Sequence, residues 1–139
     1  MKNILFLCTG NSCRSQMAEG WAKLLKSEKY NFYSAGTKEH GLNPRAVTVM
    51  REVGVDISGQ KSKTINDLPE TNMDYIVTLC SDADETCPHF AGGKVFHHGF
   101  DDPPKITADF DDEEEILNIY RRVRDEIKDF VNNIEEMEP

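Results

Sequence analysis

The chain has 139 residues, of which 38% are hydrophobic and 29% charged, and its formal net charge is −9. This length suits a single domain, residues 1–139, that can bury a core without disulfide or metal staples. No apolar run is long enough to span a membrane, and residues 1–3 lead into a strand without a signal-peptide profile. We therefore expect a cytoplasmic protein, monomeric by default, with no membrane partner.

The negative charge is concentrated near the C-terminal end. Residues 1–100 hold 11 acidic and 11 basic residues, whereas residues 101–139 hold 14 acidic and 5 basic ones. The chain shows no basic patch, so we expect no nucleic-acid partner. The acidic run 111–115 precedes an apolar stripe with a period of 3.6 residues, which predicts a terminal helix with carboxylates at its N-terminal end.

The predicted elements alternate between strands and helices. They are a strand at 3–8, a helix at 15–27, a strand at 32–36, a helix from 44 to 54, a weaker helix at 65–70, strands at 74–80 and 94–98, a loop through 102–104, and the terminal helix. Asn43 and Pro44 suit the N-cap and first position of the second helix. The first helix is expected to hold Met17, Trp21, Leu24 and Leu25 on one face. The alternation predicts an α/β fold with a four-stranded parallel sheet and helices on both faces.

The most informative motif is residues 8–15, Cys-Thr-Gly-Asn-Ser-Cys-Arg-Ser, which directly follow an apolar strand. The spacing lets a loop curl so that its backbone N–H groups face a tetrahedral oxyanion, with the Arg14 guanidinium closing the cradle. The thiolate form of Cys8 is favoured by the dipoles of these N–H groups, by Arg14 and by the start of the following helix. We therefore predict that Cys8 is the nucleophile. The Cys13 side chain is expected to be structural. The predicted oxyanion-binding residues are Thr9, Gly10, Asn11, Ser12, Cys13, Arg14 and Ser15.

Two further cysteines, Cys80 and Cys87, are separated by six residues. This is not the short Cys-x2-Cys spacing of a zinc site, and the four histidines show no complementary ligand spacing, so we predict no metal and no cofactor. Cys80 follows a predicted strand and Cys87 lies on a polar loop, a placement that favours thiol–disulfide chemistry. Two unrelated loop cysteines are the alternative interpretation.

Taken together, these motifs resemble those of the thioredoxin-coupled arsenate reductases, which share the fold of the low-molecular-weight protein tyrosine phosphatases. The resemblance covers essentially the whole chain. The oxyanion loop and Asp102-Pro103 are common to both groups, whereas the pair Cys80 and Cys87 is typical of the reductases. A phosphatase would usually have an aromatic residue where this chain has Pro104. The matching segments are 8–15, 34–36, 56–58, 79–84, 87–88, 99–103 and 122–127.

The resemblance implies an enzyme of arsenical resistance that reduces arsenate to arsenite. Cys8 would attack arsenic, and Asp102 would assist proton transfer to the departing oxygen. A Cys8–Cys80 disulfide would follow, then a Cys80–Cys87 disulfide that thioredoxin reduces. Phosphate and sulfate would compete with arsenate, and a weak side phosphatase activity is expected.

Two positions depart from the family pattern. Family members with a potassium site use residues matching Asn11, Glu19 and Ser34 and an aspartate where this chain has Lys63. A tryptophan is often found before the Gly-Phe pair, where this chain has His98. The Lys63 ammonium is therefore expected to lie near the place where relatives hold potassium.

Two other functions remain open from the sequence. The first is a low-molecular-weight protein tyrosine phosphatase in which Cys80 and Cys87 protect Cys8 from oxidation. The second is a non-enzymatic module that binds arsenite or a soft metal through the thiols of Cys8, Cys80 and Cys87.

Overall fold

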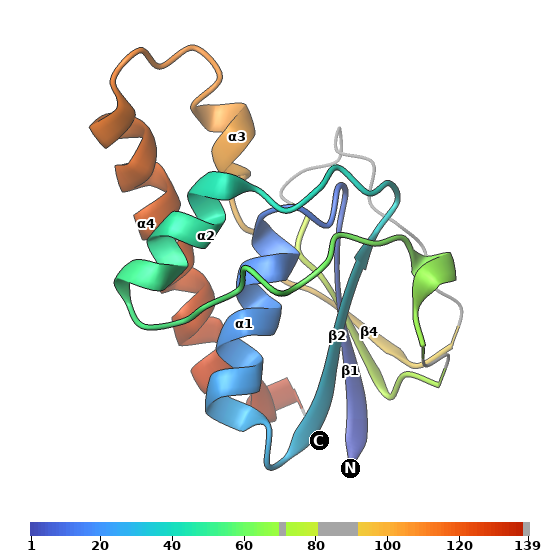
Figure 1. The fold of residues 1–139 in the computed structure, drawn as a ribbon. Coiled ribbons are helices and arrows are strands. Elements are labelled where there is room, and N and C mark those ends of the chain that lie inside the picture. The colour runs from blue at the N-terminus through green and yellow to red at the C-terminus, as the bar shows by residue number, and fades with distance from the viewer. Residues whose placement is uncertain (70–71, 81–91, 138–139) are drawn as a thin grey trace.

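The computed structural model, described here for residues 1–69, 72–80 and 92–137, has a parallel sheet with helices packed against it (Figure 1). The strands are β1 (Lys2–Cys8), β2 (Tyr30–Gly36), β3 (Tyr75–Thr78) and β4 (Lys94–His97), in the order β2-β1-β3-β4. The predicted four-stranded parallel α/β fold is confirmed. The chain passes from β1 to β2 on one side and later to β3 on the other, so the crevice beyond the carboxyl end of β1 is a topological switch point.

The helices are α1 (Arg14–Lys26), α2 (Pro44–Glu52), α3 (Pro103–Ile106) and α4 (Glu113–Asn132), with 3-10 turns η1 (Ile65–Asp67) and η2 (Ile134–Met137). Figure 1 shows α1, α2 and α4 together on one face of the sheet, where α1 and α2 both pack against α4. Helices were expected on both faces of the sheet, but the two faces are covered unequally. In the described residues, the face opposite α1, α2 and α4 carries only η1 and the segment around it.

Alternating side chains of β1 feed two separate cores, as the period of two residues along a strand requires. Ile4 and Phe6 point into the large core shared with α1, α2 and α4, whereas Leu5 and Leu7 join a smaller cluster on the other face. All four side chains are fully buried. The central strand is therefore fixed from both sides, and so is the loop that leaves its carboxyl end.

Local signals explain where two of the helices begin and end. The side chain of Asn43 accepts hydrogen bonds from the backbone N–H groups of Arg45 (2.8 Å) and Ala46 (3.2 Å), as predicted for the N-cap of α2. The weaker helix predicted at 65–70 is only the single turn η1. Leu68 precedes a proline and has extended backbone angles (φ −68°, ψ 134°), because a following proline disfavours the helical region.

Two details of the helices differ from what the sequence alone indicates. Leu24 and Leu25 are 59% and 37% exposed, because the last turn of α1 extends beyond the core while its buried residues run from Arg14 to Ala22. The loop predicted through 102–104 is shorter than expected, because residues 103–106 form α3. Its prolines occupy the first helical positions, where a missing backbone N–H costs no internal hydrogen bond.

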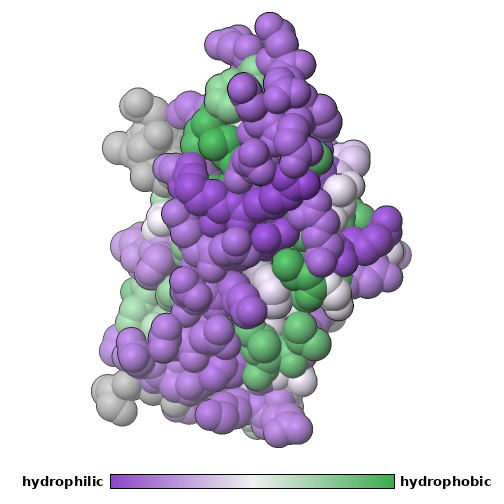
Figure 2. Space-filling model, turned by 90° about the vertical axis from the view of Figure 1, so that its left-hand side faces the viewer, coloured by the Kyte–Doolittle hydropathy of each residue, from purple (hydrophilic) through white to green (hydrophobic). Residues whose placement is uncertain are grey.

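The outer face of α4 carries part of the C-terminal acidic excess in ion pairs. Arg121 lies 2.8 Å from Glu52 and 2.6 Å from Glu114, and Arg122 lies 3.0 Å from Asp101. Figure 2 shows the side of the molecule that lies to the left in Figure 1, where α2 and α4 are. This side is mainly hydrophilic, with small separated hydrophobic patches. Within the described ranges, no helix combines the length and the apolar character needed to cross a membrane.

Candidate active site

Cys8 is the last residue of β1 and opens into a cavity of 320 Å³ at the switch point. Leu7 pairs in register with Thr78 of β3, so Cys80, two residues further along, follows the neighbouring strand at the same edge of the sheet. Asp102 reaches the cavity from the connection between β4 and α3. The residues that line the cavity are Cys8, Thr9, Gly10, Ser12, Cys13, Arg14, His40, Asn43, Asp102 and Pro104.

The carbonyl groups of the loop after Cys8 are bound by the segment that follows β2. The carbonyl of Thr9 accepts from the N–H of Thr37 (2.9 Å), that of Gly10 from the N–H of His40 (3.1 Å), and that of Ser12 from the N–H of Asn43 (3.1 Å). In a trans peptide the N–H points away from the carbonyl. The N–H groups of these peptides are thus directed away from segment 37–43, as an oxyanion cradle requires.

Asn11 fixes the loop from behind. Its backbone is left-handed (φ 46°), a conformation that asparagine tolerates better than most residues. Its side-chain nitrogen donates to Ser15 Oγ (2.8 Å), and its side-chain oxygen accepts from the backbone N–H of Lys63 (2.8 Å) and from Gln16 Nε2 (3.0 Å). The side chain is completely buried. Asn11 and Ser15 therefore shape the cradle without lining the cavity.

Ser15 connects this support to the sulfur of Cys8. Ser15 Oγ lies 2.9 Å from Cys8 Sγ and already accepts a hydrogen bond from Asn11. The hydroxyl hydrogen of Ser15 can therefore point at the sulfur of Cys8. Cys8 is a free cysteine and only 2% exposed. Its sulfur can therefore be reached by solvent or substrate only through the cavity.

Arg14 is held by two strand ends at once. Its Nη1 donates to the carbonyls of Leu79 and Phe100, each at 3.1 Å, and its Nη2 lies 3.7 Å from Asp102 Oδ2. The side chain is 3% exposed. These contacts set the plane of the guanidinium at the wall of the cavity. They also join it to Leu79, the residue before Cys80, and to the segment that carries Asp102.

Cys13 lies at the N-terminal end of α1 and belongs to the large core. Burial raises the pKa of its thiol well above the ordinary value, and the nearby charges of Cys8 and Asp102 raise it further. A thiol with a raised pKa stays protonated and is a poor nucleophile. This environment agrees with the structural role predicted for its side chain.

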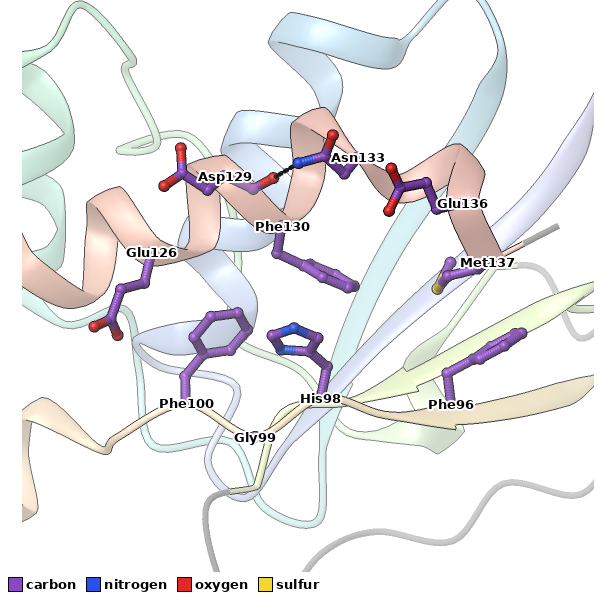
Figure 3. Close-up of a pocket in the computed structure, with 10 residues that line it drawn as sticks. All are labelled: Phe96, His98, Gly99, Phe100, Glu126, Asp129, Phe130, Asn133, Glu136 and Met137. Atoms are coloured by element: carbon purple, nitrogen blue, oxygen red, sulfur yellow. Dashed lines mark hydrogen bonds between the residues drawn. The ribbon is translucent and has the colours of Figure 1, made fainter.

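The segment before Asp102 rests on an aromatic cluster. The centroid of the His98 ring lies 4.8 Å from that of the Phe100 ring and 4.3 Å from that of the Phe130 ring (Figure 3). A larger cavity of 720 Å³ lies beside this cluster, but it contains neither Cys8 nor Arg14. The catalytic candidates therefore belong to the smaller cavity. Because the carbonyl of Phe100 holds Arg14, the cluster still supports the site.

Lys63 lies near two of the residues that the potassium-site resemblance indicated, Ser34 and Glu19. Its Nζ is 2.9 Å from the carbonyl of Lys61, 3.5 Å from Ser34 Oγ and 3.7 Å from Glu19 Oε1. Glu19 also accepts from Ser34 and from Lys23. Burial lowers the pKa of Lys63, while the charge of Glu19 acts in the opposite direction. The ammonium thus occupies an oxygen-lined position behind the loop.

Most of the predicted site residues meet at this edge of the sheet, and three residues of the cavity were missed. His40, Asn43 and Pro104 line it but belong to no motif around Cys8. Asn43 was expected only as a helix cap, and its side-chain nitrogen also donates to the hydroxyl of Tyr120 (3.1 Å). Cys87 lies outside the described residues, so its predicted role stays a prediction.

Comparison with known proteins agrees with this geometry. The family model for low molecular weight phosphotyrosine protein phosphatase matches residues 3–137. An arsenate reductase of Bacillus licheniformis is 51% identical over 136 residues, which cover 97% of this chain and 96% of its own. One of Bacillus subtilis strain 168 is 53% identical over 127 residues, covering 91% and 89%.

Among solved structures, one described as an arsenate reductase in the phosphate binding state superposes with a TM-score of 0.76. It is 33% identical and covers 99% of this chain and 98% of its own. The family model spans nearly the full length, including the cysteine–arginine loop, and the relatives cover more than nine tenths of the chain. The chain therefore belongs to the low molecular weight phosphotyrosine protein phosphatase family, in the group that contains the arsenate reductases.

Proposed function

We propose that the protein reduces arsenate to arsenite, with Cys8, Cys80 and Cys87 as the redox cysteines and thioredoxin as the final reductant. The observation that carries the proposal is the arrangement at the switch point. A buried cysteine and arginine form an oxyanion cavity, and a second cysteine follows the adjacent strand. The names of the full-length relatives support the same substrate.

In the first step arsenate binds against Arg14 and the N–H groups of the loop. The Cys8 thiolate attacks arsenic and forms a sulfur–arsenic bond, while one oxygen takes up protons and leaves as water. Asp102, whose carboxylate lies 3.7 Å from Arg14, is close enough to the cavity to assist this proton transfer. Ser15 stabilises the thiolate before the attack.

In the second step Cys80 attacks the sulfur of Cys8. The new sulfur–sulfur bond replaces the sulfur–arsenic bond, whose electron pair stays on arsenic, so arsenic(V) becomes arsenic(III) and leaves as arsenite. The two cysteines together lose two electrons. Cys87 then attacks Cys80, which restores the Cys8 thiolate, and thioredoxin reduces the Cys80–Cys87 bond. Leu79 links Cys80 to the cradle, because it precedes Cys80 in the chain and its carbonyl accepts a hydrogen bond from Arg14.

A side phosphatase activity is the second candidate, favoured by the family match and by the position of Asp102 at the cavity. A phosphoester needs the nucleophile, the cradle and a proton donor, but neither Cys80 nor Cys87. The phosphatase activity should therefore depend on Cys8 and be independent of the other two cysteines.

The test is arsenate-dependent oxidation of NADPH in the presence of thioredoxin and thioredoxin reductase. We expect Cys8→Ser, Cys80→Ser and Cys87→Ser each to abolish multiple turnover, and Cys13→Ser, the matched control, to retain much of it. Only Cys8→Ser should abolish hydrolysis of a small aryl phosphate. Wild-type protein without arsenate-dependent turnover would refute the reductase assignment, and phosphatase activity that is lost with Cys80→Ser would refute this division of roles.

A further inference from the structure

The charges around the oxyanion cavity do not balance for a doubly negative substrate. Of the described residues that line it, Arg14 alone is permanently positive, while Cys8 and Asp102 are acidic groups that become negative when they lose a proton. The pKa of Cys13 is raised by burial first and by the charges of Cys8 and Asp102 next, whereas Arg14 only partly offsets them. An arsenate dianion adds further negative charge. A second cation would therefore add to the binding that Arg14 and the N–H groups of the loop supply.

His40 is the other lining residue that can become positive. Its backbone N–H donates to the carbonyl of Gly10 (3.1 Å), which anchors it to the oxyanion loop. Its ring lies directly against Gly10, because a Cβ atom added there would be only 2.5 Å from His40 Nδ1. His40 is exposed, whereas Arg14 is buried. The imidazole thus lies on the solvent side of the cavity and the guanidinium at its wall.

We propose that His40 is a substrate-binding residue whose protonated imidazole donates a hydrogen bond to an oxygen of the bound arsenate. This inference rests on the proposed function. A hydrogen bond with an ionised donor and an ionised acceptor is roughly twice as strong as a neutral one. Arsenite is uncharged near neutral pH, so the same group binds the substrate more tightly than the product. His40 therefore favours both arsenate capture and arsenite release.

The proposal has a consequence for pH, because only the protonated imidazole carries the positive charge that the proposal requires. The other titratable or charged groups at the cavity are Cys8, Cys13, Arg14 and Asp102, and Lys38 and Glu39 precede His40 on its own segment. Sulfate keeps both negative charges whether or not the imidazole is protonated. With sulfate as the probe, any change in affinity must come from the protein.

The experiment measures sulfate binding by calorimetry in a Cys8→Ser background, which removes the titration of the nucleophile. We compare that protein with the same protein carrying His40→Gln. At about pH 5.5 the substitution should weaken sulfate binding about tenfold, and at about pH 8 the two proteins should agree within about twofold. Lys38→Gln is the matched control, because it removes a neighbouring cation that does not line the cavity. It should change the affinity less than about twofold at either pH.

A second readout follows the imidazole itself. In the Cys8→Ser protein, saturating sulfate should shift the NMR titration of His40 to higher pH, because binding and protonation are linked reciprocally. Equal sulfate affinity with and without His40→Gln at low pH would overturn the proposal. So would a loss of the same size at both pH values, which would indicate a neutral or purely structural role. Neither measurement requires turnover, so failure to reduce arsenate would refute the proposed function and leave the sulfate result to be judged separately.

Discussion

The oxyanion loop has two faces with opposite requirements. Its cavity face presents Cys8 and Arg14 to a space of 320 Å³ that a substrate can enter. Its outer face is closed by hydrogen bonds, with both ends of the Asn11 side chain and the Gln16 amide engaged. Preorganised donors stabilise charge only if their support does not move. The reactive face therefore depends on a layer of polar side chains behind it whose hydrogen bonds are all made.

The largest expected effect comes from the cavity face. Arg14→Lys keeps the charge but loses the planar guanidinium, whose Nη1 donates to Leu79 and Phe100 while its Nη2 faces Asp102. We expect kcat/KM for arsenate to fall about 100-fold or more, comparable to the loss of one oxyanion donor elsewhere. Arg45→Lys is the matched control, since Arg45 forms an exposed pair with Glu113. If Arg14→Lys binds arsenate almost as well as wild type, the cradle geometry is wrong.

A smaller effect is expected from the outer face. Asn11→Ala removes hydrogen bonds to Ser15 and Gln16 in a buried site, and alanine is strained at a φ of 46°. The free energy of unfolding should fall by about 2 kcal/mol or more, because unsatisfied buried groups cost about 1–3 kcal/mol. Denaturant titration measures this change, and arsenate turnover should fall with it.

Asn11→Gly separates the two causes of that loss. Glycine accepts the left-handed backbone without strain but makes none of the side-chain hydrogen bonds. If the polar layer positions the loop, turnover should stay low in the glycine variant even where part of the stability returns. Full recovery of turnover would show that Asn11 matters only for its backbone conformation.

The contrast between the two faces also explains what could be predicted from sequence. The loop is specified locally, since Cys8, Arg14 and Ser15 are close in the chain and directly follow a buried strand. The groups that complete it come from distant segments. His40, Asn43 and Lys63 reach the loop only because β2 and η1 pack beside β1, and no spacing within their own segments indicates this. The resemblance to a potassium site indicated Lys63, whereas no motif indicated His40.

Local signals failed for the helices where tertiary packing decides. Leu24 and Leu25 continue the apolar stripe of α1, but the core ends one turn earlier, so periodicity alone overestimates burial. The Pro103-Pro104 pair suggested a loop, although two prolines are compatible with the first turn of a helix.

A third prediction concerns the cation behind the loop. Lys63 Nζ already lies near three oxygens, from Lys61, Ser34 and Glu19, so a bound potassium ion would have to displace a covalently attached ammonium. We expect equal initial rates of arsenate reduction in potassium and sodium salts at equal ionic strength. A several-fold activation specific to potassium would contradict this assignment.

The smallest effect on turnover is expected for Cys13, which lies between the two faces. Cys13→Ser should leave arsenate turnover largely intact, because the raised pKa of the buried thiol keeps it protonated and unreactive. Its effect should instead appear in the stability at alkaline pH. In the unfolded chain the thiol releases its proton near pH 8.5, whereas the folded protein retains it to higher pH.

The sign of that effect follows from the proton count. Above about pH 8.5 the folded state binds more protons at Cys13 than the unfolded state, so this residue's contribution to stability falls as pH rises toward the folded pKa. The slope is at most about 1.4 kcal/mol per pH unit. Urea unfolding at a series of pH values should show a steeper alkaline loss for wild type than for Cys13→Ser. Parallel curves for the two proteins would mean that Cys13 ionises as readily in the folded protein as in the unfolded chain, and that the cavity wall beside Cys8 is less well shielded from water than its burial indicates.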